Sequence, residues 1–148
     1  MPQSPAPASP SILLADDDPN LVRVLSFAFK ASGYRVEMAL DGAVALEALE
    51  LGRYDVLVLD ILMPGATGWE VLARAIEQTP PGKELPRAIF ITGFNQEYVV
   101  DMNMLRQEGV AAMLLKPFTA TTLIEEIQRV LAQPPQYSRP RANQPSKA

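Results

Sequence analysis

Two apolar segments of this chain end in aspartate, which makes these acidic residues the first candidates for chemistry. Asp16, Asp17 and Asp18 follow the segment SILLA, and Asp60 is the last residue of DVLVLD. Burying a carboxylate that has no partner costs free energy. Neighbouring carboxylates raise one another's pKa unless a cation joins them. A few hard oxygen ligands with room for water favour Mg²⁺, or Mn²⁺, over Zn²⁺. Asp16, Asp17 and Asp60 therefore predict a magnesium site, and Asp18 remains to cap a helix.

A lysine and a threonine stand at the ends of two further apolar segments. Thr92 closes RAIFIT, and Lys116 follows AAMLL. The lysine ammonium is a compact positive charge that suits a phosphoryl oxygen, and the threonine hydroxyl is a hydrogen-bond donor. A carboxylate, a metal ion, a lysine and a hydroxyl together can move a phosphoryl group onto a carboxylate oxygen. We therefore predict that Asp60 is a phosphoryl acceptor beside the metal ion.

The segments that carry these residues alternate with helical patterns. Short apolar runs predict five strands, at residues 11–15, 34–39, 55–60, 87–92 and 111–115. The second run alternates polar and apolar residues, so it is expected at a sheet edge, whereas the others suit a sheet covered by helices on both faces. Asp18, Asp41 and Thr119 can cap the first, second and fifth helices. Trp69, Leu72 and Ile76 mark a third helix, and a fourth is expected near residues 96–108. Five strand–helix units predict an α/β fold with a doubly wound, five-stranded parallel sheet.

The strand order decides which of these side chains meet. In a flavodoxin-like sheet with the order 2-1-3-4-5, ligands bind beyond the carboxyl ends of the strands, where the order reverses. The first and third strands are neighbours at that point, so Asp16 and Asp17 are expected beside Asp60. The fourth and fifth strands bring Thr92 and Lys116 to the same edge.

Composition excludes several other kinds of chemistry. The chain has 148 residues, no cysteine and no histidine, so a disulfide, a thiolate metal site and a phosphohistidine carrier are excluded. A net charge of −4 favours neither nucleic acid nor a membrane as a partner. A cytoplasmic protein, monomeric or weakly dimeric, is expected. The proline-rich residues 1–10 and 133–148 have little to bury, so we expect disordered tails on either side of one domain at residues 11–132.

Four motifs, ILLADDDP, VLVLDILMPGATGWE, IFITG and LLKPF, occur in order, each at the end of a predicted strand. Together they resemble the receiver domain of bacterial two-component response regulators, over residues 11–132. The resemblance implies a CheY-like three-layer sandwich that takes a phosphoryl group, with Mg²⁺, from the phosphohistidine of a sensor histidine kinase or a histidine phosphotransfer protein. It implies a signalling domain, not an enzyme, that then switches a protein–protein interaction and does not bind DNA.

The resemblance also implies a role for each matching residue. In the order phosphorylated aspartate, acidic metal-binding pair, lysine and switch hydroxyl, these residues are Asp60, Asp16, Asp17, Lys116 and Thr92. The backbone carbonyl of Leu62 is expected to be a further metal ligand. The Lys116–Pro117 peptide bond is expected to be cis.

Two positions depart from the family pattern. Met113 stands three residues before the lysine, where an aromatic residue is usual, so the ring that normally turns inward on activation is missing. Phe94 stands two residues after Thr92, where a polar residue is commoner. Side chains at Leu62 and Phe94 flank the path of the attacking water in this family, and both are apolar. They therefore predict slow self-dephosphorylation.

The expected partner surface is the face formed by the fourth helix, the fifth strand and the fifth helix. The segment EYVVDMNMLRQE carries more apolar residues than one core-facing stripe can hold. The residues proposed for this surface are Phe94, Tyr98, Val99, Met102 and Met113. We predict that a downstream protein binds there and that phosphorylation reshapes the surface. The competing interpretation is a helix that is buried more deeply than usual.

Other functions stay open as alternatives. A phosphohydrolase with an aspartate nucleophile typically needs a second aspartate two residues later, where this chain has Leu62. A flavin-binding electron carrier would place ADDDPN against the flavin phosphate, which the carboxylates would repel. The chain can also be a receiver fragment of a larger multidomain regulator, or a receiver that binds partners without being phosphorylated.

Overall fold

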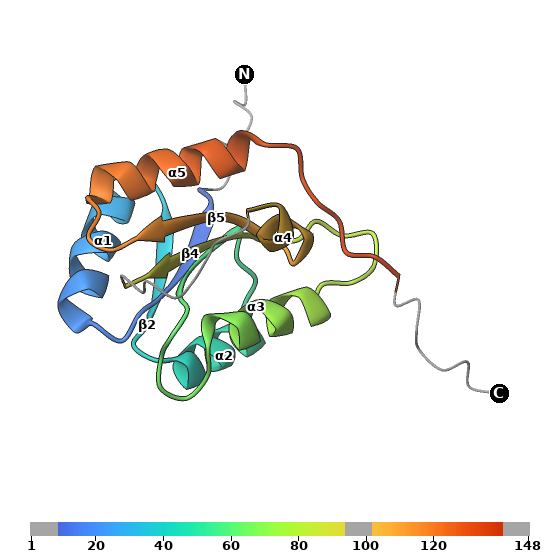
Figure 1. The fold of residues 1–148 in the computed structure, drawn as a ribbon, viewed down its shortest axis with the longest axis horizontal. Coiled ribbons are helices and arrows are strands. Elements are labelled where there is room, and N and C mark those ends of the chain that lie inside the picture. The colour runs from blue at the N-terminus through green and yellow to red at the C-terminus, as the bar shows by residue number, and fades with distance from the viewer. Residues whose placement is uncertain (1–8, 94–101, 141–148) are drawn as a thin grey trace, which may run out of the picture.

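The computed structural model describes residues 9–93 and 102–140, and within them five strands alternate with five helices (Figure 1). The strands are β1 (Ser11–Ala15), β2 (Arg35–Ala39), β3 (Val56–Asp60), β4 (Arg87–Thr92) and β5 (Val110–Leu115). The helices are α1 (Pro19–Ala31), α2 (Gly42–Leu51), α3 (Gly68–Glu77), α4 (Met102–Gln107) and α5 (Ala120–Ala132). Each predicted strand bound agrees within one residue. The first part of the predicted fourth helix lies outside the described residues.

The sheet has the predicted topology. Its strands lie in the order β2-β1-β3-β4-β5, and every neighbouring pair is parallel. This confirms the doubly wound sheet and places β2 at an edge, as its alternating sequence predicts. Helices α1 and α5 cover one face of the sheet, and α2 and α3 cover the other (Figure 1). Because β1 and β3 are parallel neighbours, their carboxyl ends lie side by side, at the reversal in strand order.

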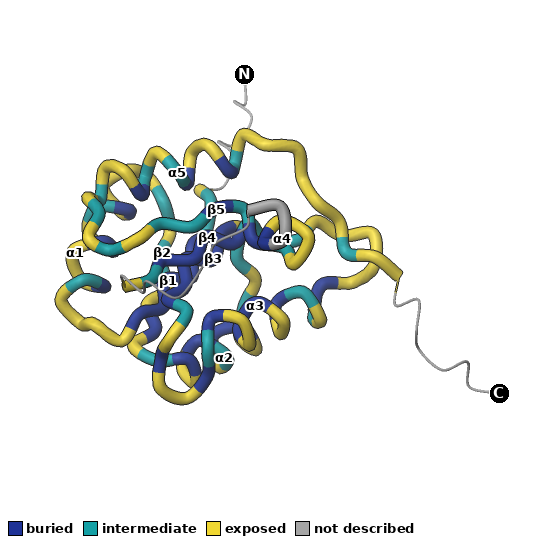
Figure 2. The backbone as a smooth tube through the Cα atoms, viewed as in Figure 1, coloured by how far each residue is buried: buried dark blue, intermediate teal, exposed yellow. Residues whose placement is uncertain are grey.

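Each face of the sheet has its own apolar core. Leu13 and Leu57 pack toward α2 and α3, whereas Ile12 and Val58 pack toward α1 and α5. The central strands are buried along their length (Figure 2). Strands that are covered on both faces are a rigid base for the side chains at their carboxyl ends. No helix among the described residues is long and apolar enough to cross a membrane.

The three predicted helix caps are confirmed. The Asp18 carboxylate accepts hydrogen bonds from two backbone N–H groups at the start of α1, at 3.0 and 3.3 Å. Asp41 accepts one from α2 at 2.8 Å, and the Thr119 hydroxyl accepts one from α5 at 3.1 Å. Each cap fixes where a helix leaves the carboxyl edge of the sheet.

The C-terminal strap, which we define as residues 133–140, corrects the prediction of a disordered tail from residue 133. Tyr137 forms an antiparallel bridge with Glu84, and three backbone hydrogen bonds of 2.8 to 2.9 Å join the strap to residues 82–85. The prolines of the strap lack N–H groups, but Ser138 between them keeps its N–H and carbonyl and uses both. Proline content alone therefore did not decide whether the segment pairs.

The predicted N-terminal tail needs a smaller correction. The carbonyl oxygens of Ser9 and Pro10 each accept a hydrogen bond from Arg35 at 3.0 Å. These two residues therefore bind to β2 and are not part of a free tail. The remaining tail predictions concern residues 1–8 and 141–148, which lie outside the described residues.

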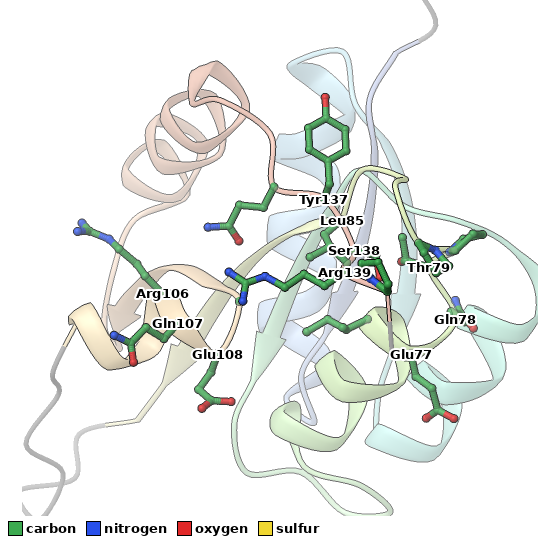
Figure 3. A pocket seen from close by; sticks show the side chains of 16 residues that line it. Glu77, Gln78, Thr79, Leu85, Arg106, Gln107, Glu108, Tyr137, Ser138 and Arg139 are labelled. Carbon is green, nitrogen blue, oxygen red and sulfur yellow. The ribbon is translucent and has the colours of Figure 1, made fainter. Parts of the chain in front are cut away.

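The strap also forms one wall of a cavity of about 1160 Å³. The other walls are the end of α3, the segment before β4 and the end of α4, and Tyr137, Ser138 and Arg139 lie along the strap side (Figure 3). This cavity lies at the amino ends of β4 and β5, so the aspartates at the carboxyl ends of β1 and β3 are at the opposite edge of the sheet.

Candidate functional site

The predicted acidic cluster forms at the carboxyl ends of the strands. Asp16 and Asp17 follow β1 and Asp60 ends β3, and the pairing of these two strands brings the three residues together. One carboxylate oxygen from each lies within 4.8 Å of the others. Asp16 and Asp60 are buried, at 0% and 6% exposure, whereas Asp17 is exposed. The cluster thus has two fixed carboxylates inside and one at the solvent side.

Local hydrogen bonds hold the two inner carboxylates in place. The backbone N–H of Asp16 donates to the carbonyl of Ala39 on β2 at 3.1 Å. Its Oδ1 accepts from the N–H of Asp18 at 2.9 Å, which closes the turn into α1. The Oδ1 of Asp60 accepts from the N–H of Leu62 at 3.3 Å. Each aspartate is therefore oriented by the backbone of the turn that follows its strand.

Lys116 lies between the two buried carboxylates. Its Nζ is 2.6 Å from Asp16 Oδ2 and 3.4 Å from Asp60 Oδ2. Among the described residues, Asp16 Oδ2 has no partner in hydrogen-bonding geometry, so its contact with Lys116 is best described as an ion pair. The lysine backbone N–H donates to the carbonyl of Thr92 at 2.7 Å, which anchors the end of β5 to β4. The expected cis bond between Lys116 and Pro117 is confirmed.

The electrostatics of the cluster leave a surplus of negative charge. Burial, and next the charge of Asp16, raise the pKa of Asp60, although Lys116 and the N–H of Leu62 oppose the rise. Partial burial by itself lowers the pKa of Lys116, but its contacts with Asp16 and Asp60 outweigh burial and the pKa is raised. Lys116 is therefore positively charged at neutral pH. Its single charge is shared between Asp16 and Asp60 and does not fully offset the burial of the Asp60 carboxylate.

The residues fit a hard divalent cation. They offer three carboxylates within reach of one another, and a buried oxygen, Asp16 Oδ2, retains capacity for a further positive partner. The donor set is all oxygen, which suits Mg²⁺ and Mn²⁺ better than Zn²⁺. Exposed Asp17 gives the cluster an open side toward solvent. A cation here would also offset the cost that Asp60 bears when ionised.

Thr92 and Leu62 occupy the rim of the cluster. Thr92 is the last residue of β4, one position beyond Ile91, which pairs with Asp60. Its hydroxyl donates to the carbonyl of Gly93 at 3.3 Å and so does not bind a carboxylate of the cluster. The Leu62 side chain is 59% exposed, directly after the Asp60 strand end. The Leu62 carbonyl as a metal ligand and the Thr92 hydroxyl as a switch both stay predictions.

The predicted partner surface is described only in part. Met113 on β5 is half-buried, pairs in register with Phe90, and packs on the core beneath α2 and α3. Phe94, Tyr98 and Val99 lie outside the described residues, as does the side chain of Met102, although its backbone begins α4. The partner surface therefore stays a prediction.

Three glycines around the loop after Asp60 were missed from the sequence. A Cβ on Gly42 would lie 2.0 Å from the carbonyl oxygen of Ala66, and one on Gly68 would lie 2.6 Å from that of Asp60. Gly65 has a φ of 87°, and a Cβ there would lie 2.9 Å from the backbone of α2. Gly42 and Gly68 directly follow capping residues, where glycine is a poor helix former. A glycine directly after a capping residue was therefore the sequence feature that could have indicated a close approach of two backbone segments.

A family model described as the response regulator receiver domain matches residues 12–128. The matched range includes every residue of the cluster.

Two curated relatives are similar over most of this chain. The response regulator receiver protein CpdR of Brucella abortus is 37% identical over 121 residues, which cover 81% of this chain and 95% of CpdR. The transcriptional regulatory protein TrcR of Mycobacterium tuberculosis is 32% identical over 132 residues, which cover 87% of this chain and 48% of TrcR. The chain thus spans nearly all of one relative and about half the length of the other.

A solved structure agrees at the level of the fold. A CheY-like response regulator receiver domain protein from Methanospirillum hungatei JF-1 superposes with a TM-score of 0.69 at 26% identity. The match covers 83% of this chain and 94% of that protein.

Proposed function

Because this chain belongs to the response regulator receiver domain family, we propose that it signals by accepting a phosphoryl group on Asp60, with Mg²⁺ held beside it. The family resemblance and the CheY-like fold predicted from the four motifs are confirmed, and receiver domains are signalling domains. The observation that carries the proposal is the position of Asp60. It is 6% exposed, undercompensated in charge, and within reach of two further carboxylates and of Lys116.

The proposed reaction is the transfer of a phosphoryl group between two proteins. A carboxylate oxygen of Asp60 attacks the phosphorus of a phosphohistidine on a sensor kinase or phosphotransfer protein. The P–N bond breaks, its electron pair stays on the imidazole nitrogen, and that nitrogen takes a proton as the imidazole leaves. The product is an acyl phosphate on Asp60. Neither oxidation nor reduction occurs.

Residues of this chain would hold the reactants. Asp16 and Asp17, with Asp60 and the Leu62 carbonyl, would bind Mg²⁺, which supplies positive charge to the phosphoryl oxygens. Lys116 already touches both buried carboxylates, at 2.6 and 3.4 Å, so its ammonium is placed to pair with a phosphoryl oxygen on Asp60. The Thr92 hydroxyl, which now donates to Gly93, would donate to another phosphoryl oxygen after a change of side-chain rotamer.

The direction of signalling completes the proposal. The phosphorylated domain would switch the binding of a downstream protein at the surface that contains α4, β5 and α5, as in the sequence-based prediction. We propose a protein partner and no DNA contact for this domain, in a cytoplasmic setting and as a monomer or weak dimer. Catalysis beyond self-phosphorylation and self-dephosphorylation is not part of the proposal, since Leu62 stands where an aspartate phosphohydrolase needs its acid or base.

A labelling experiment with a matched control tests the acceptor. Acetyl phosphate and Mg²⁺ should add one phosphoryl group to the native chain, as read by intact mass, and Asp60→Asn should abolish the addition. Asp55→Asn is the control, because Asp55 is exposed one residue before β3 begins and binds Ser11 at the other edge of the sheet. A labelled Asp60→Asn protein, or an unlabelled Asp55→Asn protein, would contradict the assignment.

A further inference from the structure

The loop after Asp60, residues 61–67, lies directly against the backbone of α2. The N–H of Gly42, the first residue of α2, donates to the carbonyl of Pro64 at 2.9 Å. A Cβ at Gly42 would lie 2.0 Å from the carbonyl oxygen of Ala66 and 2.6 Å from its carbonyl carbon and nitrogen. Real Cβ atoms do not approach backbone so closely, so only glycine lets α2 and the loop meet at this distance.

Two further glycines allow close backbone contacts at the loop, one with α2 and one with the end of β3. A Cβ at Gly65 would lie 2.9 Å from the backbone nitrogen of Ala43. A Cβ at Gly68, where α3 begins, would lie 2.6 Å from the carbonyl oxygen of Asp60. We call Gly42, Gly65 and Gly68 the glycine clamp. Through these close contacts the loop packs between α2 on one side and the end of β3 on the other.

The loop that the clamp holds carries groups of the candidate metal site. Its ends are fixed by hydrogen bonds, from the N–H of Ile61 to Ile91 at 3.2 Å and from the N–H of Gly68 to Ile61 at 2.8 Å. Its middle is fixed against α2 through Gly42. Leu62 lies between these points, its N–H on the Asp60 carboxylate and its side chain in solvent. The path of the backbone at Leu62 thus depends on a helix that itself contributes no side chain to the acidic cluster.

We propose that the glycine clamp is a positioning device for the metal site, so that the start of α2 sets the affinity for Mg²⁺. The proposal rests on the proposed function, because it assumes that the Asp16, Asp17 and Asp60 cluster binds Mg²⁺. Gly42 is a positioning residue: it acts through the loop and touches neither metal nor phosphoryl group. A Cβ at 2.0 Å from the Ala66 carbonyl oxygen would force the loop away from α2, and that displacement would move the Leu62 carbonyl and the Asp60 carboxylate relative to each other. Small displacements of groups that orient metal ligands weaken metal binding strongly.

Gly42→Ala tests the proposal, with Gly52→Ala as its matched control. Gly52 ends the same helix, and the nearest atoms to a Cβ there are 3.7 Å away on the Tyr54 side chain. A second control, Ile127→Val, removes one methyl group from the fully buried core under α5 and lowers stability without touching the loop. Mg²⁺ is titrated into each protein, and the backbone amide shifts of residues 60–68 are followed by NMR.

Native protein, Gly52→Ala and Ile127→Val should bind Mg²⁺ with the same Kd, and Gly42→Ala should bind about tenfold more weakly while still folded. A native Kd for Gly42→Ala overturns the proposal, and so does an equal loss in Ile127→Val, which would mean that lowered stability is the cause.

If Gly42→Ala does not fold, Asp41→Ala decides the question. It removes the cap that fixes the start of α2, a bond of 2.8 Å to Val44, and adds no bulk. It should weaken Mg²⁺ binding, and a native Kd would overturn the proposal. Failure of the native protein to bind Mg²⁺ would instead overturn the proposed function and the clamp's role with it.

Discussion

Asp60 is held in a setting that disfavours its own charge. Burial and the neighbouring Asp16 raise its pKa. Below the pKa of the unfolded chain, Asp60 is protonated in both states and has no effect on stability. As the pH rises from the pKa of the unfolded chain to the higher pKa of the folded protein, stability falls, because the unfolded chain releases this proton first; above the folded pKa the loss is complete and constant. The Mg²⁺-free protein at neutral pH therefore carries a destabilising carboxylate at the site where we propose that phosphorylation occurs.

Asp60→Asn should therefore raise Tm at pH 7 by a few degrees when Mg²⁺ is absent. The gain should shrink as the pH falls, because the native carboxylate then becomes protonated. Added Mg²⁺ should stabilise the native protein more than the variant. Thermal unfolding monitored by circular dichroism between pH 4 and pH 8, with and without Mg²⁺, measures this. A Tm that falls on substitution at pH 7 would contradict the account of the site.

Lys116 compensates the most deeply buried charge of the site. Lys116→Met would leave Asp16, which is 0% exposed, without its ammonium at 2.6 Å. We expect a loss of roughly 2–3 kcal/mol in the free energy of unfolding, below the range for a fully buried pair because the lysine side chain is 26% exposed. Mg²⁺ should restore part of this loss. Urea denaturation checks it, with exposed Lys83→Met as control, and equal stability of the two variants would argue against the ion pair's role.

The apolar side chains of Leu62 and Phe94 should govern how long the phosphorylated form lasts. Leu62 is 59% exposed beside Asp60 and cannot orient a water molecule by hydrogen bonding. Phe94 lies outside the described residues and enters from the sequence alone. The double variant Leu62→Asn with Phe94→Glu should lose its phosphoryl group on the order of tenfold faster than the native protein. Decay is followed after removal of the phosphodonor, and equal rates would exclude an apolar gate.

At this scale the sequence predicted the charged residues better than the residues that support them. Asp16, Asp17, Asp60 and Lys116 were predictable because charged residues at the ends of apolar strands have few structural uses. The glycine clamp was not predictable, since a glycine at a helix start is compatible with many roles. Its contacts depend on where α2 lies relative to the loop, and that distance is a property of the folded chain.

Among the elements, strands and capped helices were predictable and the C-terminal strap was not. Strands β1, β3 and β4 are continuous apolar runs, and α1, α2 and α5 begin at capping side chains, so local patterns were sufficient. The strap pairs with residues 82–85 through backbone N–H and carbonyl groups, and a pattern of side chains does not predict such pairing. Arg87 also joins β4 to this region, because its guanidinium donates to the carbonyls of Val130 and Gln133 at 3.3 and 3.0 Å.

Ending the chain after Ala132 should therefore cost stability without destroying the fold. Three backbone hydrogen bonds to the strap and one from Arg87 are lost, and the ordering entropy of the strap is recovered. We expect a net loss of roughly 1–2 kcal/mol. Hydrogen exchange should quicken at the amides of Gly82 and Leu85, which donate to the strap, and stay unchanged in β1 and β3. Unchanged exchange at Gly82 and Leu85 would show that the strap does not pair in solution.

At the scale of the whole molecule, the two edges of the sheet differ in kind. The acidic cluster, Lys116 and the clamped loop lie at the carboxyl ends of the strands. The strap and its cavity lie at the opposite end of the sheet (Figure 3). The central strands β1, β3 and β4, which are buried on both faces, connect the two ends of the sheet, so the centre of the sheet is rigid between them. The movable parts of a switch must then be the loops and helices around it, which is consistent with the proposed readout through α4.

The most direct test of the central claim identifies the atom that carries the phosphoryl group. Borohydride reduces an aspartyl acyl phosphate to homoserine, so peptide mapping after acetyl phosphate treatment and reduction reads the acceptor by mass. We predict homoserine at position 60 when Mg²⁺ is present, and little or none when it is chelated. Homoserine at another aspartate, or labelling of Asp60 that does not depend on a divalent cation, would contradict the account.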